Sequence, residues 1–352
     1  MKTKSVFILT VLLLTCSVYA QKNVNVDNLR FSYWERLLPK KPQQPMFFYY
    51  SIEMDMPRSV KIHVDEGQLQ DQLVIAGQRY TDDPKEGDML VHLKMAPVNI
   101  LNSTVKERVV ESKSKSGEVT RTYYYWVEVN YNFEAQAVAS ISQVKKEAYS
   151  LYNRVHTQAF KSQEYNTRKG ASDYWNNNRE VLIEQFTREC ADNAIKKLTT
   201  SLSADFGFPI VKTSVLIKTI NEKKHPENDL LRSKSSQLKA TMEKLDGKTP
   251  LAKEDMKELI AYFKSIPERY TDTELKADVR LRYVAFYNLC RIYLFLDQPK
   301  NVKKWADLLF ANGHDKKDAE RLTEDAESLH KRLNQTIIKA TQFDTEDYFT
   351  EE

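Results

Sequence analysis

RTYYYWVEVNYNFEAQAVASISQ, residues 121–143, is the stretch from which the expected fold is built. Alternate positions along it are apolar or aromatic, and most positions between them are polar. Because the side chains of a strand point alternately to its two faces, the pattern predicts a long β-strand with one face in a core. The apolar set is Tyr123, Tyr125, Val127, Val129, Tyr131, Phe133, Ala135, Ala137, Ala139 and Ile141. A strand of this length is expected to bend, and we place the bend in the small residues at 135–139.

The neighbouring segments are expected to pair with this strand. Residues 104–113 and 119–131 form a predicted hairpin around Gly117, because glycine readily supplies the positive φ of a turn. Residues 148–160 keep the two-residue period and are predicted to return along the long strand. Further strands are predicted earlier in the chain, at 47–54, 59–64, 72–75 and 88–95.

One long amphipathic helix is predicted at residues 174–204, after a break at Gly170. Its apolar ladder repeats every four residues and comprises Leu182, Phe186, Cys190, Ala194, Leu198 and Leu202. A last strand is predicted at residues 210–220. This order predicts an α+β fold in which one long helix packs on a largely antiparallel sheet.

The composition changes at residues 221–229, NEKKHPEND, and only helical patterns follow. We therefore expect a β-rich α+β domain at 21–220 and an all-α domain of helical hairpins at 221–343. Helices are predicted at 229–245, 250–266, 272–296, 301–311 and 316–333. Residues 344–352 carry five acidic side chains and are predicted to be a solvated tail.

Residues 1–20 have the features of a secretory signal peptide. Lys2 and Lys4 precede an apolar run at 6–14, which is too short to span a bilayer, and residues 18–20 resemble a cleavage site. We expect export to the periplasm or the extracellular space, with association with the outer membrane left open. Lipid attachment at Cys16 is the alternative, although Thr15 stands where bacterial lipoproteins usually have glycine, alanine or serine.

Charge and motifs exclude several classes of function. The formal net charge of +4 is small for 352 residues and gives no reason to expect nucleic acid as a partner. The eight glycines match neither a dinucleotide-binding nor a Walker motif, and no G-x-S-x-G motif occurs. His63 with Asp65, and His314 with Asp315 and Asp318, supply too few ligands for a metal site. We expect no enzyme, cofactor or metal; dispersed carboxylates of a hydrolase are an alternative that spacing does not exclude.

Two cysteines lie beyond the leader, Cys190 and Cys290. Both fall on apolar faces of predicted helices, as buried free thiols commonly do. Because an exported protein can form disulfides, a bridge between the two domains is the alternative.

The predicted helical pair at residues 286–314 resembles a tetratricopeptide unit. The residues at the family's intervals are Phe286, Leu289, Cys290, Tyr293, Val302, Ala306 and Leu309. Val302 and Leu309 replace the family's usual alanines, and His314 stands where that family has proline. The match occurs once, whereas stable arrays need about three repeats. The resemblance implies a helical hairpin and, by analogy, binding of peptides or proteins.

The β-domain is similar in element order to some periplasmic assembly proteins, namely the curli-secretion lipoproteins and the lipoprotein activators of penicillin-binding proteins. Order alone identifies no functional residue.

Tyr124 and Trp126 lie on the otherwise polar face of the central strand. If they are packed, another layer such as Phe31, Tyr33 and Trp34 would cover them. If they are exposed, they would form a platform for a sugar ring or a partner's side chain.

From the signal-peptide features, the absence of catalytic motifs and the tetratricopeptide-like hairpin, we expect a non-catalytic bacterial envelope protein that binds other envelope proteins as an assembly scaffold. Carbohydrate binding through Tyr124 and Trp126 is the alternative.

Overall fold

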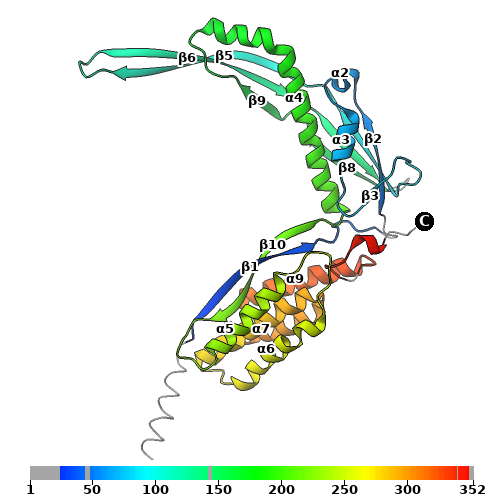
Figure 1. Ribbon diagram of the computed structural model, residues 1–352, viewed down its shortest axis with the longest axis vertical. Coiled ribbons are helices and arrows are strands. Elements are labelled where there is room, and N and C mark those ends of the chain that lie inside the picture. Colours follow the sequence, from blue (N-terminus) through cyan, green and yellow to red (C-terminus); the bar gives the residue numbers. More distant parts are fainter. Residues whose placement is uncertain (1–23, 44–47, 142–144, 339, 349–352) are drawn as a thin grey trace, which may run out of the picture. The chain divides into compact units, whose positions relative to one another are not determined.

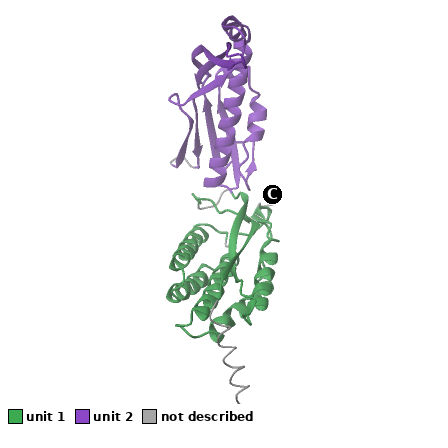
Figure 2. Cartoon of the chain, turned by 90° about the vertical axis from the view of Figure 1, so that its left-hand side faces the viewer, with its two compact units in different colours: residues 1–46, 208–352 green, residues 47–207 purple. Residues whose placement is uncertain are grey.

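The computed structural model describes residues 24–43, 48–141, 145–338 and 340–348. The chain forms two compact units, which we call the helical unit (residues 1–46 and 208–352) and the sheet unit (residues 47–207; Figure 2). Helices and mainly antiparallel strands occur in both, which confirms the predicted α+β class (Figure 1). The predicted signal peptide, Cys16 and residues 349–352 lie outside the described residues.

The helical unit contains a two-stranded antiparallel sheet made from distant parts of the chain. β1 (Val26–Arg36) pairs along its whole length with β10 (Ile210–Ile220). Side chains from both strands, including Phe31, Tyr33 and Ile217, enter the core formed by the helices. The division of the chain therefore differs from the boundary predicted at residue 221, because β1 and β10 bury their apolar residues against the helices.

Five α-helices follow β10, at positions close to the predicted ones. They are α5 (Asn228–Met242), α6 (Lys257–Arg269), α7 (Lys276–Phe295), α8 (Pro299–Ala311) and α9 (Lys316–Asn334), with the 3-10 helix η1 (Lys253–Met256) before α6. Each helix contacts the next, and β10 contacts α5 and α7 (Figure 1). α7 is apolar on most of its circumference, and it is accordingly buried on nearly every side.

The end of the described chain packs against the helical unit. The Thr341 amide and hydroxyl donate to the Asp297 carboxylate at 2.8 Å each. In the 3-10 helix η2 (Thr345–Tyr348), Thr345 is buried and Tyr348 contacts the buried ring of Phe343. The prediction of a solvated tail from residue 344 is therefore wrong for Thr345 and Tyr348, which pack against the unit, whereas Glu346 and Asp347 are exposed as expected.

The sheet unit contains two sheets, one long helix and two short helices at residues 58–61 and 66–72. The larger sheet has the order β3 (Arg79–Tyr80), β2 (Tyr49–Asp55), β4 (Met89–Met95), β7 (Ala135–Ser140), β8 (Lys146–Tyr152). The smaller has the order β5 (Asn99–Lys113), β6 (Val119–Asn132), β9 (Thr157–Lys161). α4 (Arg168–Asp205) packs on the apolar face, where the rings of Phe186 and Tyr131 stack with centroids 4.3 Å apart.

Within residues 121–141, the predicted long strand is divided between β6 and β7. The break falls at Phe133 and Glu134, just before the predicted bend at 135–139. The strands that pair with β7 and β6 are β4 and β5, and Pro97 lies between these two. Proline has no N–H to continue the ladder. The Ala96 amide donates to the Glu134 carbonyl at 2.8 Å and so closes the break.

Four local predictions in the sheet unit are wrong. Residues 59–64 and 72–75 are not strands, since α2 (Arg58–Lys61) and α3 (Glu66–Gln72) lie there and the Asp65 side chain caps α3. Residues 148–160 do return along the long stretch, β8 pairing with β7 and β9 with β6, but they form two strands in different sheets and not one, because Asn153 accepts from two backbone amides and turns the chain. Gly170 does not break a helix but lies in the first turn of α4, capped by Thr167.

Candidate functional sites

Tyr124 and Trp126 are two positions apart on β6, so their side chains lie on the same face, and each is half-buried. A cation covers each ring: the Arg108 guanidinium carbon lies 5.1 Å from the Tyr124 centroid, and Lys161 Nζ lies 4.1 Å from the Trp126 centroid. The cations come from the neighbouring strands β5 and β9, which flank β6 in the sheet. The structure therefore brings the two predicted platform residues together under basic side chains of the same sheet.

We call Arg108, Tyr124, Trp126 and Lys161 the cation–aromatic strip. Two carboxylates contact it. Glu164 pairs with Arg108 at 3.0 Å and with Lys161 at 3.7 Å. Glu128 accepts from Trp126 Nε1 at 3.1 Å and lies 3.9 Å from Lys106. The rings thus already have partners within the sheet, and a sugar could stack on Trp126 only where Lys161 moved aside.

The aromatic residues that the sequence suggested as a cover belong to the other unit. Phe31, Tyr33 and Trp34 belong to β1 of the helical unit, where Phe31 and Tyr33 are core residues. No strand is predicted from the sequence for this segment, and the sequence carries no signal that pairs it with residues 210–220.

Beyond the strip, the β5–β6 hairpin continues as a two-stranded ribbon that stands clear of the other strands of its unit (Figure 1). We call residues 109–123 the distal hairpin. Its turn contains Gly117 at φ +88°, as predicted. Its exposed apolar side chains are Val109, Val110, Val119 and Tyr123, which are 43%, 40%, 52% and 41% exposed. Sequence reasoning missed this feature, although the β-branched residues in a predicted hairpin were visible.

The residues of the tetratricopeptide-like pattern all lie in the core of the helical unit. Phe286 stacks on Trp305 with ring centroids 6.0 Å apart, and Leu289, Val302 and Leu309 are fully buried between α7 and α8. The pattern residues Cys290, Tyr293 and Ala306 are buried with them. The motif therefore forms a helical hairpin here and leaves none of its own residues on the surface.

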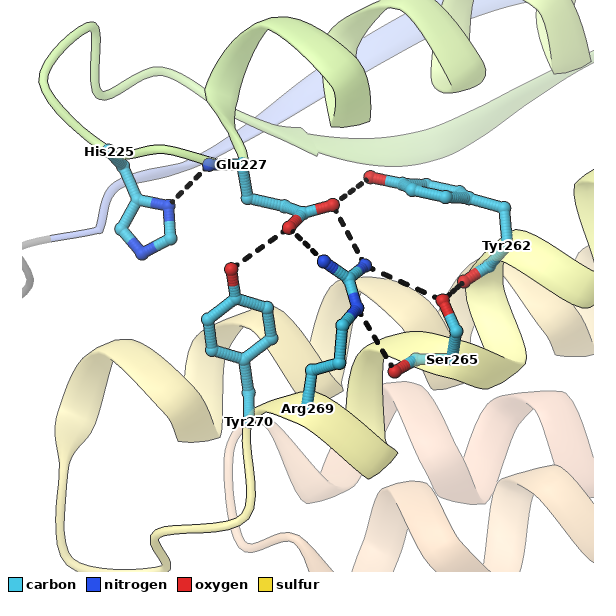
Figure 3. A network of polar contacts seen from close by, with 6 residues as sticks. All are labelled: His225, Glu227, Tyr262, Ser265, Arg269 and Tyr270. Carbon is cyan, nitrogen blue, oxygen red and sulfur yellow. Dashed lines mark hydrogen bonds and ion pairs between the residues drawn. The ribbon is translucent and has the colours of Figure 1, made fainter.

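A buried carboxylate joins the start of α5 to the end of α6 (Figure 3). Glu227 accepts from Tyr262 at 2.7 Å, from Tyr270 at 2.9 Å, and from two nitrogens of Arg269 at 2.6 and 3.0 Å. A carboxylate has about four lone-pair positions, so this cluster uses them all. We call these four residues the Glu227 cluster.

The protonation of the Glu227 cluster follows from these contacts. Burial alone would raise the pKa of Glu227, but the hydrogen bonds from Arg269, Tyr262 and Tyr270 outweigh it and lower the pKa overall. Burial and the bond to the carboxylate raise the pKa of Tyr270 to about 12. The nearby His225 accepts from the Glu227 amide through Nδ1, and burial lowers its pKa (Figure 3). With every acceptor position occupied, the cluster stabilises the fold and has no free group for acid–base catalysis.

A cavity of about 260 Å³ lies in the helical unit between the β1–β10 sheet and helices α7 and α9. We call it the sheet–helix cavity. Glu35 lines it and accepts from the Tyr33 hydroxyl at 2.8 Å and the Thr213 hydroxyl at 2.6 Å. Thr341 also lines the cavity, and its amide donates to the Asp297 carboxylate. Burial raises the pKa of Asp297 to about 6. No motif marked this cavity, because its walls come from strands and helices that are far apart in sequence.

The histidines and cysteines take structural positions. His63 Nδ1 lies 3.9 Å from Glu184, Asp65 caps α3, and His314 contacts the edge of the Tyr283 ring. Within the described part of the chain, no group of three or more histidine, cysteine or acidic side chains is placed to hold a metal ion. Cys190 and Cys290 are buried free thiols in different units, rather than the bridge considered as the alternative.

No protein-family model matches the chain, and no curated protein sequence matches it either. Among the described residues, no helix combines the length and apolar character needed to cross a membrane.

Proposed function

We propose that the protein is an exported, non-catalytic scaffold of a bacterial envelope, and that the distal hairpin is the surface that binds its protein partner. The observation that carries this proposal is the set of exposed valines and Tyr123 on a lone two-stranded ribbon. Val109, Val119 and Tyr123 lie on one face of the ribbon and Val110 on the other, since successive side chains of a strand alternate. Such ribbons are marginally stable in water, and exposed apolar groups gathered on one face commonly mark interaction surfaces. The signal-peptide features of residues 1–20 support export.

The outer edge of β5 supports the same role. Among the strands that the structure describes, β5 is an edge strand, paired with β6 on one side only. An edge presents backbone N–H and C=O groups to which another chain can add a strand. Charged residues on β5, such as Lys106, Glu107 and Arg108, oppose indiscriminate pairing between copies. A partner strand along this edge would also cover Val109 and Val110.

The experiment compares the mature chain, residues 21–352, with a variant whose distal hairpin is replaced by Asn-Gly. This replacement joins Arg108 to Tyr124, which already face each other across the ladder, and leaves the cation–aromatic strip in place. Affinity capture from native envelopes, read by quantitative mass spectrometry, should recover a reproducible set of envelope proteins with the intact chain and lose it with the variant.

A surface change in the other unit serves as the control. Leu308→Ser alters a side chain of α8 that is 41% exposed, and capture should stay unchanged. Recovery of the same proteins by the shortened variant, with the sheet unit folded by circular dichroism, would contradict the proposal. Recovery of glycan-bearing material alone would favour the carbohydrate alternative, and Trp126→Ala would then test it.

A further inference from the structure

The sheet–helix cavity offers an acceptor group on its sheet side. The Glu35 carboxylate is held by two neutral hydroxyls, those of Tyr33 and Thr213. Among the residues that the structure describes, no cation lies within ion-pair distance of it. Because a carboxylate has about four lone-pair positions, Glu35 can still accept from a ligand that enters the cavity.

The helix side of the cavity offers donors. Arg332 of α9 lines the cavity, its Nε–H is buried without an acceptor, and its guanidinium forms no ion pair with any described carboxylate. Arg291 of α7 also lines the cavity and is mostly buried; it contacts the Tyr287 hydroxyl and lies 3.6 Å from Asp325 at the rim. Ser328 is one helical turn before Arg332 and so lies on the same face of α9.

Arg332 is part-buried, and Asp297 acts on it electrostatically, but its Nε–H is buried without an acceptor. A buried donor without a partner is costly, so this side of the cavity favours a ligand that accepts from Arg332. Arginine binds carboxylates especially well, because its fork matches their two oxygens. The volume of about 260 Å³ lies below the ~300–1,000 Å³ of pockets for drug-sized ligands. The size therefore suits a ligand of a few heavy atoms, with a negative group toward Arg332 and a donor toward Glu35.

We propose that the sheet–helix cavity binds an α-amino acid, with its carboxylate at Arg332 and Arg291 and its ammonium at Glu35. The site lies entirely within the helical unit, whereas the distal hairpin belongs to the sheet unit. Amino-acid binding is thus independent of the scaffold role, and either proposal can fail while the other stands.

The test is isothermal titration calorimetry of the mature chain with the free amino acids, and then with modified forms of the best binder. An N-acetylated form removes the ammonium, an amidated form removes the carboxylate, and dipeptides separate the two charges. We expect at least one free amino acid to bind with a Kd below ~1 mM, and each modification to weaken binding at least about tenfold. Dipeptides that bind as tightly as the free amino acid would overturn the assignment to a single amino acid.

Arg332→Gln and Glu35→Gln should each weaken binding at least about tenfold, because each removes one charge-assisted bond. Lys303→Gln, a surface change on α8 whose side chain is 58% exposed, should leave it unchanged. Circular dichroism confirms that each variant is folded, and if Arg332→Gln unfolds, Glu35→Gln decides. Absence of heat for every amino acid with the intact protein, or unchanged affinity in folded variants, overturns the proposal.

Discussion

The Glu227 cluster and the distal hairpin use tyrosine and charge in opposite ways. In the cluster, Tyr262 and Tyr270 give their hydroxyls to a buried carboxylate, and every polar group meets its partner. In the hairpin, Tyr123 stacks on Tyr125 at a centroid distance of 6.5 Å and is still 41% exposed. The difference teaches that the polar groups of the Glu227 cluster are used up in holding the fold, while the distal hairpin leaves apolar side chains exposed in the sheet unit.

The largest effect is expected from Glu227→Ala. It removes four hydrogen bonds to a buried carboxylate and leaves two part-buried hydroxyls and the Arg269 guanidinium, which is 43% exposed, without their shared acceptor. At about 1 kcal/mol for each bond, the free energy of unfolding of the helical unit should fall by about 3–5 kcal/mol. Denaturant-dependent hydrogen exchange, read on peptides of each unit, measures this separately for the two units.

A matched exposed pair sharpens the contrast. Glu111→Ala breaks a 2.7 Å bond to Arg121 on the distal hairpin, where both side chains are more than half exposed, and should cost less than about 1 kcal/mol. Equal costs for Glu227→Ala and Glu111→Ala would break the comparison.

The Glu227 cluster should also respond to pH. Because the pKa of Glu227 is lowered below its usual 4.5, the cluster's stabilisation should be present above that pH and disappear as pH falls through the folded pKa.

The next effect concerns apolar burial. Leu289→Ala removes a fully buried side chain from the α7 core and should cost about 2–5 kcal/mol. Val109→Thr keeps a β-branched residue at an exposed hairpin position and should change stability by no more than about 0.5 kcal/mol. Thermal and denaturant unfolding check both, and a large loss for Val109→Thr would show that the hairpin serves the fold.

How far the sequence predicts the structure depends on the range of the contacts. Local periodicity correctly predicts β10, the hairpin around Gly117 and the five C-terminal helices. It does not predict that β1 pairs with β10, because the two-residue period marks a buried face but not the partner strand. Glu35 and Thr213 are separated by 178 positions, so the wall of the sheet–helix cavity has no local signature.

A smaller effect is expected from Asp297→Asn. The pKa of Asp297 is raised from 3.8 to about 6, so the folded state binds this proton more tightly than the unfolded chain. Protonation of Asp297 therefore stabilises the folded state by an amount that grows as pH falls from above 6 toward 4. This stabilisation reaches at most about 3 kcal/mol and is absent at higher pH. Asparagine also tolerates the positive φ of 53° at this position.

Unfolding of the helical unit between pH 4 and 7 should consequently be less pH-dependent in Asp297→Asn than in the natural protein. The measurement follows exchange of peptides from α9 in denaturant. An unchanged pH dependence would show that another group dominates it.

The smallest effect is expected in the cation–aromatic strip. Lys161→Met removes the ammonium over Trp126 and one contact of Glu164 while keeping an unbranched side chain, and should cost about 0.5–1 kcal/mol. Tryptophan fluorescence should change, because the charge 4.1 Å from the Trp126 centroid is lost. Lys85→Met, a lysine of the exposed turn before β4, serves as the control and should leave the spectrum unchanged.

The most direct test of the scaffold role is site-specific photo-crosslinking in intact cells. A photoreactive phenylalanine analogue replaces Tyr123 or Val109 on the distal hairpin, and Leu308 or Ile337 on the helical unit. We predict a discrete adduct with an envelope protein from the two hairpin positions and none from the two control positions. Adducts from the control positions alone, or no adduct from either hairpin position, would contradict it.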